Sequence, residues 1–273
     1  MIKPLLAFIC ILSICSCNNS NQQNSGVNDS AATPDATLSP AIINMQQQLQ
    51  QFPDSAGLRL SLALAFDSIK AYTQANAQMD TLVAKDSTNY GLWFSKAQLL
   101  EDSGDTLNAM ESYAKAAAIY PSPDAILGLA NLYAEQKNER CLLLCKQVKD
   151  MSLGREYDAH CAFITGVYNA RTNNPTEAVY FFNQCIKDNY TYMPAYIEKG
   201  LVYFDHQQYR EALNVFQFAS TIDNLYADAY YYMARCYEML QVTDSAVLRY
   251  QQALNLDKTM HEAQQGLARL HAQ

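Results

Sequence analysis

Residues 193–226 read MPAYIEKGLVYFDHQQYREALNVFQFASTIDNLY, and residues 227–260 repeat their pattern of large and small apolar side chains. A shift of 34 positions superimposes Tyr196 on Tyr230, Tyr203 on Tyr237, Ala212 on Ala246, Phe216 on Tyr250 and Ala219 on Ala253. A fixed period of this length is the sequence signature of a solenoid, in which supersecondary units stack on one another. The period therefore predicts an extended repeat protein, which works by presenting a surface to other molecules.

Six such units follow one another, at residues 56–89, 90–123, 124–158, 159–192, 193–226 and 227–260. Polar stretches inside the units, such as residues 102–105 and 205–208, predict a short turn between two antiparallel helices. We expect the third unit to be the least regular, with residues 150–158 forming a longer connection that contains Gly154. Residues 41–55 and 261–273 are expected to cap the two ends with polar outer faces.

Several units share landmark residues. The second unit holds Trp93, Ala97, Gly104, Ala109, Tyr113, Ala116 and Pro121, and the fifth holds Tyr196, Gly200, Tyr203, Ala212, Phe216 and Ala219. In these landmarks, residues 56–260 resemble the tetratricopeptide repeat family. The resemblance implies an all-α, right-handed superhelical solenoid over residues 41–273, with about six helix-turn-helix units and a capping helix at each end.

The first seventeen residues have the pattern of a targeting segment. Lys3 is followed by an apolar run over residues 5–14 that is too short to span a bilayer. The run leads into Cys15, Ser16 and Cys17, which resemble the lipobox of lipoproteins from diderm bacteria. The resemblance implies that residues 1–17 form a lipoprotein signal peptide that is cut before Cys17, and that lipid, such as palmitate, is attached to that thiol. Cys15 is the poorer candidate, and the alternative is an ordinary secretory signal with incidental cysteines.

Residues 18–40 are rich in Asn, Ser, Gln, Ala and Thr and almost lack large apolar side chains. Such a composition predicts a disordered tether, because it cannot bury enough apolar surface to fold. No acidic residue follows Cys17 directly. By resemblance to lipoprotein sorting, we expect attachment to the outer membrane, with the protein facing the periplasm.

The composition argues against two classes of function. Lys and Arg number 19 against 27 Asp and Glu, which gives a net charge of −8 without any dense basic run. Nucleic acid is therefore excluded as a partner, because its binding requires a basic footprint. The chain also lacks a phosphate-binding loop, a zinc-protease motif and a recognisable catalytic triad. We expect no enzymatic activity and no cofactor.

The resemblance places partner binding in the concave groove, which the first helix of each unit lines. The groove positions recur five and nine residues into each unit and predict an apolar and aromatic lining, suited to an amphipathic helix or an extended apolar peptide of a partner protein. The predicted lining residues are Phe94, Phe163, Val167, Ile197, Leu201, Phe204, Tyr231 and Arg235. The alternative is that these side chains only pack neighbouring helices together.

Five cysteines follow Cys17. A metal site of Cys141, Cys145, His160 and Cys161 is conceivable but has loose ligand spacing, and simple packing is favoured. The favoured function is a non-enzymatic, lipid-anchored scaffold of the cell envelope that binds a partner protein or peptide. The alternatives are a permanent subunit of an outer-membrane or peptidoglycan-associated complex and, less favoured, a metal-binding protein.

Overall fold

The computed structural model describes residues 39–271, and every element in that range is a helix. The fourteen helices of the described range are α1 (Pro40–Gln51), α2 (Ala56–Ser68), α3 (Tyr72–Lys85), α4 (Tyr90–Asp102), α5 (Thr106–Ile119), α6 (Pro123–Glu135), α7 (Arg140–Asp150), α8 (Arg155–Arg171), α9 (Pro175–Asp188), α10 (Met193–Asp205), α11 (Tyr209–Ile222), α12 (Ala227–Met239), α13 (Thr243–Leu256) and α14 (His261–His271). The predicted signal peptide, Cys17 and nearly all of the predicted tether lie outside the described residues. No helix of residues 39–271 is both long and apolar enough to cross a membrane.

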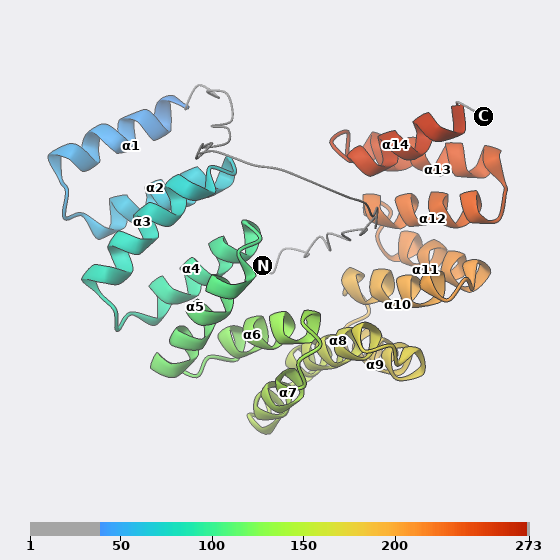
Figure 1. Ribbon diagram of the computed structural model, residues 1–273, viewed down its shortest axis with the longest axis horizontal. Coiled ribbons are helices and arrows are strands. Elements are labelled where there is room, and N and C mark those ends of the chain that lie inside the picture. Colours follow the sequence, from blue (N-terminus) through green and yellow to red (C-terminus); the bar gives the residue numbers. More distant parts are fainter. Residues whose placement is uncertain (1–38, 272–273) are drawn as a thin grey trace, which may run out of the picture.

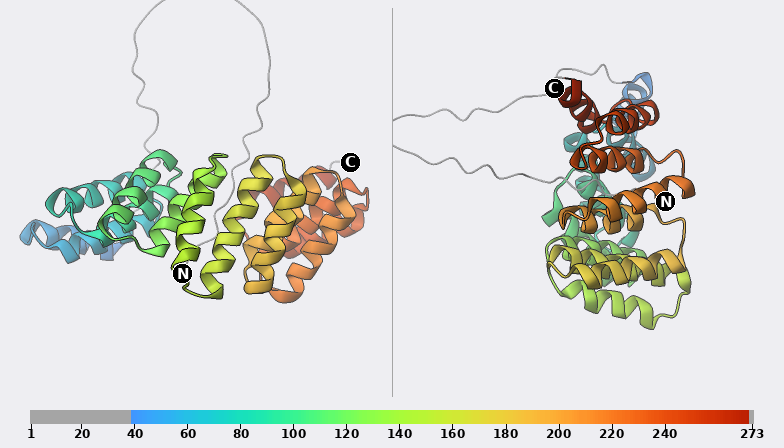
Figure 2. Two further views of the ribbon diagram at one scale, coloured as in Figure 1. Left: turned by 90° about the horizontal axis from the view of Figure 1, so that it is seen from below. Right: turned by 90° about the vertical axis from the view of Figure 1, so that its right-hand side faces the viewer.

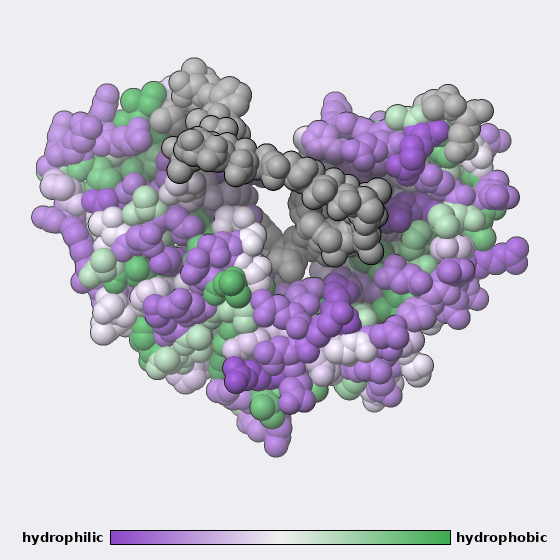
Figure 3. Space-filling view, in the orientation of Figure 1, coloured by the Kyte–Doolittle hydropathy of each residue, from purple (hydrophilic) through white to green (hydrophobic). Residues whose placement is uncertain are grey.

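The helices form a curved stack with two arms (Figure 1). α1 and α14 lie at the tips of the arms, and α7 lies at the base of the curve, on its outside. The views in Figure 2 show the helices standing side by side along the stack. The space-filling view is hollowed between the two arms, and hydrophilic side chains predominate on the face that it shows (Figure 3). The chain thus has an inner surface that several helices share.

In four of the units the helix pair closes around one large aromatic ring, which belongs to Tyr113, Phe182, Phe216 or Tyr250. Phe182, Phe216 and Tyr250 are completely buried, and so are the alanines one turn earlier on the same helices, Ala178, Ala212 and Ala246. These alanines let the paired helices approach closely enough to enclose the ring. Because the rings recur with the period of the sequence, the core is a row of similar small clusters along the stack.

A second repeated contact ties the first helix of a unit to the preceding loop. The donor atoms are Arg59 Nη2, Trp93 Nε1, Tyr196 Oη, Tyr230 Oη and Gln264 Nε2, and each donates to the backbone carbonyl six residues earlier, at 2.8–3.2 Å. In the third and fourth units the same position holds Leu127 and Ala162, which are buried. The two central units therefore lack this tie.

The sequence lacks proline at most of the boundaries between units, and Asx turns close them instead. The side-chain oxygens of Asp86, Asn189, Asp223 and Asp257 each accept a hydrogen bond from the backbone N–H two residues later. Asp and Asn favour such turns because their short side chains reproduce the geometry of a backbone turn. The boundaries are thus fixed without the proline that ends the second unit.

The centre of the stack departs from the regular pattern. α7 has only 11 residues, and α6 packs directly against α8. Residues 150–158 were expected to form a long connection, but α8 begins at Arg155 and continues for 17 residues. The connection is confined to residues 151–154, where Ser152 (φ 54°) and Gly154 (φ 100°) take positive backbone angles. These two residues turn the chain sharply enough for the helix to start four residues before the predicted boundary.

Candidate partner-binding surface

Two of the predicted groove residues are core residues. Val167 on α8 is 1% exposed and Ile197 on α10 is 8% exposed. Both belong to apolar clusters inside the stack, so their assignment to an open groove was wrong. The physical reason is that helical spacing defines a face of a helix, while the neighbouring helices decide how much of that face stays open.

Phe94 and Phe163 are half-buried and hold other rings in place. Phe94 on α4 lies 5.7 Å from the ring of Tyr90 and 5.8 Å from that of Tyr113. Phe163 on α8 lies 5.1 Å from the ring of Tyr192. The structure does not bring Phe94 to the remaining predicted residues, because α4 belongs to the opposite arm from α10 and α12 (Figure 1).

The other four predicted residues come together on α10 and α12. We call Leu201, Phe204, Tyr231 and Arg235 the α10–α12 cluster; all four are half-buried. The guanidinium carbon of Arg235 lies 4.7 Å from the centre of the Phe204 ring and 6.0 Å from that of Tyr231. A cation over an aromatic face is attracted by the negative charge density of the ring. The guanidinium of Arg235 therefore lies over the Phe204 ring, with the Tyr231 ring nearby.

Arg235 makes no ion pair with another described residue. Within residues 39–271 no carboxylate lies within 4 Å of its guanidinium nitrogens. Stacking on a ring uses the face of the guanidinium and leaves the N–H groups at its edge available for hydrogen bonds. Arg235 is therefore oriented to receive an acceptor from another molecule.

A pocket of about 240 Å³ adjoins the cluster and shares Leu201 with it. Its polar lining comes from Lys137, Arg171, Glu198, Asp205 and His206. These residues belong to the last turn of α8, to α10 and to the turns after α6 and α10. The surface thus changes from aromatic to charged across one helix, α10.

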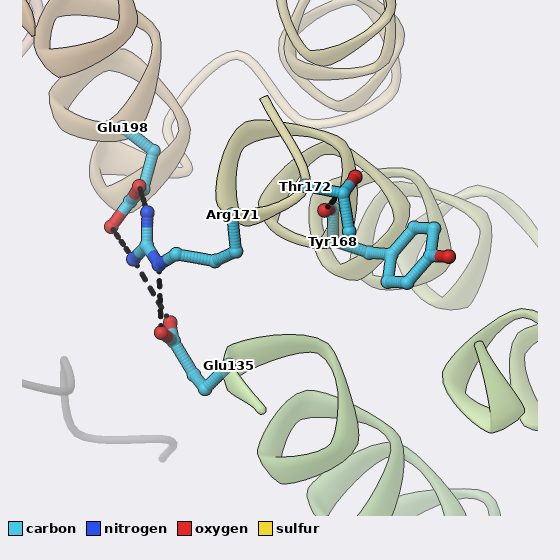
Figure 4. A network of polar contacts seen from close by, with 5 residues as sticks. All are labelled: Glu135, Tyr168, Arg171, Thr172 and Glu198. Atoms are coloured by element: carbon cyan, nitrogen blue, oxygen red, sulfur yellow. Dashed lines mark hydrogen bonds and ion pairs between the residues drawn. The ribbon is translucent and has the colours of Figure 1, made fainter. Parts of the chain in front are cut away.

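Arg171 occupies the middle of the charged part and binds two carboxylates (Figure 4). Its Nε and Nη2 donate to Glu135 at 2.8 and 3.0 Å, and its Nη1 and Nη2 donate to Glu198 at 2.9 and 3.1 Å. The exposed fractions of the three side chains are 25% for Arg171, 26% for Glu135 and 12% for Glu198. Both contacts are bidentate, the geometry in which guanidinium binds carboxylate most strongly.

Two carboxylates, those of Glu135 and Glu198, pair with the single guanidinium of Arg171. Burial raises the pKa of Glu198, and the negative charges of Glu135 and Asp205 raise it further, while Arg171 acts in the opposite direction. Burial also raises the pKa of Asp205, against the attraction of Arg171 and Arg235. The two carboxylates raise the pKa of Arg171, which stays charged. In the pocket lining, Lys137 and Arg171 thus stand against the carboxyl groups of Glu198 and Asp205.

Residues 90–123 and 228–258 match family models that are described as tetratricopeptide repeat. The chain carries tetratricopeptide repeats. No curated protein matches the chain by sequence.

Solved structures of tetratricopeptide repeat proteins share the fold. A tetratricopeptide repeat protein from Parabacteroides merdae is 15% identical, with a TM-score of 0.72 over 85% of this chain and 91% of that one. PilW, a widely conserved type IV pilus biogenesis factor, is 16% identical, with a TM-score of 0.60 over 78% of this chain and 99% of that one. Yeast Tom70 is 16% identical, with a TM-score of 0.56 over 85% of this chain and 57% of that one. Likeness at these identities shows the fold alone, and it confirms the predicted tetratricopeptide repeat solenoid.

Sequence reasoning missed the charged network, although one signal was present. Glu198 stands at the repeat position that holds Ile164 one unit earlier and Tyr232 one unit later. Ile164 is 3% exposed and Tyr232 is half-buried, so the position lies inside the tetratricopeptide repeat stack. A carboxylate at an inward position needs a partner. A glutamate at a repeat position that is otherwise apolar or aromatic was therefore the sequence signal that predicts an ion pair.

The cysteines of the third and fourth repeats pack as small apolar side chains. Cys141, Cys145 and Cys161 are free thiols in the buried core around α7 and α8. The thiol of Cys161 donates to the carbonyl of Cys145 at 3.4 Å, and the His160 ring lies 5.1 Å from that of Tyr192. Within residues 39–271 no group of His, Cys, Asp and Glu side chains is arranged to hold a metal ion. The structure gives the conceived metal site no support.

Proposed function

We propose that this protein is a non-enzymatic interaction scaffold of the cell envelope that binds a partner protein through the surface of α8, α10 and α12. The proposal rests on Arg235, whose guanidinium lies over the Phe204 ring and has no carboxylate of residues 39–271 within 4 Å. Tetratricopeptide repeats, which the chain carries, typically serve protein interaction and not catalysis.

The surface specifies the chemistry of the partner segment. Leu201 and the rings of Phe204 and Tyr231 offer apolar area at which a partner side chain is desolvated. Arg235 offers N–H donors at the edge of that area, and interface residues of this kind often carry most of the binding energy. The segment that fits is one with an apolar or aromatic anchor next to a carboxylate or another strong acceptor.

The location of the scaffold follows from the sequence around the proposed lipid attachment site. Lipid on Cys17 and a tether over residues 18–40 hold the solenoid at the outer membrane, on its periplasmic face. A tether of this composition is flexible, so the solenoid can reach partners near the membrane without being fixed in one orientation.

Site-specific photocrosslinking in cells tests the surface. A benzoylphenylalanine at Met239, which is 49% exposed and one helical turn after Arg235 on α12, reports on the proposed interface. The matched control carries the same group at Leu248 on α13, which is 50% exposed. We expect a crosslinked adduct of defined mass from position 239, absent from position 248 and lost when Arg235→Ala is added.

A crosslink from position 248 alone, or an adduct from position 239 that Arg235→Ala leaves unchanged, would contradict the proposal. Far-ultraviolet circular dichroism of Arg235→Ala distinguishes loss of binding from loss of fold. A helical variant that no longer forms the adduct supports the assigned surface, because a half-buried arginine edge contributes to recognition more than to the core.

A further inference from the structure

The Glu135–Arg171–Glu198 network joins three successive repeats. Glu135 ends α6 of the third unit, Arg171 ends α8 of the fourth, and Glu198 lies within α10 of the fifth. The ion pairs Lys96–Asp80 and Arg269–Glu238 each join only two neighbouring units. Arg171 thus contacts both of its neighbouring units at once, so one side chain links three successive units of a solenoid in which units touch only adjacent ones.

The network lies where the stack is least regular. In the third and fourth units, Leu127 and Ala162 replace the donors that tie the other first helices to the preceding loop. The second helix of the third unit, α7, is short, and α6 packs directly against α8. With these repeated contacts missing, other interactions must hold the angle between α6 and α10.

The geometry of Arg171 suits it to hold that angle. Glu135 binds the edge formed by Nε and Nη2, and Glu198 binds the edge formed by Nη1 and Nη2, so the two carboxylates occupy adjacent edges of the guanidinium and share Nη2, at 3.0 and 3.1 Å. The guanidinium is planar and rigid, so its two bidentate contacts have a fixed relative direction. Partial burial of all three groups weakens the screening that would make a surface ion pair negligible.

We propose that Arg171 sets the curvature of the solenoid at its centre by locking α6, α8 and α10 at fixed mutual angles. The two arms of the inner surface then stand at a defined separation. If the guanidinium is removed, the two carboxylates converge without a cation between them, and their repulsion opens the stack at this point. This role is independent of whether the inner surface binds a partner.

Distance measurement between the arms tests the proposal on the full chain. Spin labels carried on p-acetylphenylalanine at exposed Gln98 on α4 and exposed Gln265 on α14 report the separation by pulsed electron resonance, without use of the native cysteines. We expect Arg171→Met to move the mean distance upward, beyond the width of the wild-type distribution. The matched control is Arg269→Met, which removes an exposed ion pair at the end of the stack and should leave the distribution unchanged.

Further variants keep the test decisive. Glu135→Gln and Glu198→Gln each remove one charged contact with a side chain of the same shape, and each should widen the distribution by less than Arg171→Met does. If Arg171→Met does not fold, these two glutamine variants are sufficient to test the proposal. A variant series that melts earlier but keeps the wild-type distance distribution would show that Arg171 adds stability and does not set curvature, and this result would overturn the proposal.

Discussion

The hydroxyl of Tyr250 donates a 2.7 Å hydrogen bond to the carboxylate of Glu238, twelve residues earlier on the paired helix. Tyr113 makes the same contact with Glu101 at 2.8 Å. The units with Phe182 and Phe216 at this position have no such glutamate. A glycine lies against the ring in all four cases: Gly166 and Gly200 of the same unit against the phenylalanines, and Gly128 and Gly266 of the following helix against the tyrosines. The tyrosine hydroxyl and the glutamate therefore occur together, and the unit that supplies the glycine changes with them.

The two tyrosine contacts should differ in strength. Tyr113→Phe leaves the half-buried Glu101, whose pKa is raised chiefly by burial, without its hydroxyl donor, whereas Glu238 in Tyr250→Phe keeps its ion pair with Arg269. Loss of a hydrogen bond costs about 1 kcal/mol, and more when a buried charge is left unpaired. We expect Tyr113→Phe to lower the free energy of unfolding in urea more than Tyr250→Phe does. Equal losses of unfolding free energy would mean that the Arg269–Glu238 ion pair does not compensate for the missing hydroxyl.

Glycine at position 200 is required by contact with an aromatic ring. A Cβ at this position would lie 2.3 Å from Phe216 Cε1, inside the rigid ring, whereas at Gly57 in α2 a Cβ would meet nothing within 4 Å. We expect Gly200→Ala to destabilise the protein by about 1–3 kcal/mol through overpacking. Gly57→Ala should be neutral or stabilising by up to about 1 kcal/mol, because alanine favours the helix. Thermal unfolding measures both, and equal melting temperatures would contradict the assigned packing.

The buried carboxylate of Glu198 should make stability depend on pH in an uncommon direction. Its pKa is raised above the ordinary value of 4.5, so the folded chain binds the proton more tightly than the unfolded chain. The contribution of Glu198 to stability is then fully present below pH 4.5 and declines as the pH rises through the folded pKa. We expect the melting temperature of the wild type, minus that of Glu198→Gln, to fall as the pH increases.

Glu111 supplies the control with the opposite sign. A hydrogen bond from Lys115, together with its positive charge, lowers the pKa of Glu111, which is fully exposed. The difference between wild type and Glu111→Gln should therefore grow as the pH rises toward the ordinary value of 4.5. If both differences follow the same slope, the opposite assignment of the two carboxylates is wrong.

The proposed anchor makes a direct prediction about localisation. Cys17→Ser should abolish lipid modification, because the hydroxyl cannot replace the modified thiol, and should release the protein from the membrane fraction. Metabolic palmitate labelling and membrane fractionation measure the two effects. A variant that still labels and still sediments with membranes would direct attention to Cys15.

The period of the sequence was enough to predict the helix pairs, because Ala212 and Phe216 lie one turn apart on α11 and must both face the paired helix wherever two helices enclose a ring. Exposure at one repeat position was not predictable in the same way. Val167 and Leu201 are one period apart, yet Val167 is 1% exposed and Leu201 is half-buried. The difference arises because α6 packs directly on α8, and this contact belongs to the irregular centre and not to the repeat.

The network around Arg171 was unpredictable for a related reason. Its three residues come from three units and occupy three different repeat positions, so superposition of the units does not bring them together. The three residues meet only because of the angles at which α6, α8 and α10 pack. The α10–α12 cluster was more accessible to sequence reasoning, because Leu201, Phe204, Tyr231 and Arg235 lie on two first helices that stack regularly.

The ties between first helices and preceding loops show what each repeat has to preserve. Arginine, tryptophan, tyrosine and glutamine all fulfil the same task, since each carries an N–H or O–H group that reaches the carbonyl six residues back. The requirement at this repeat position is a hydrogen-bond donor that reaches this carbonyl, and the type of side chain that carries the donor can differ. An exchange of Tyr196 for arginine would look radical in an alignment and keep the contact, whereas the apparently gentle exchange for phenylalanine would abolish it.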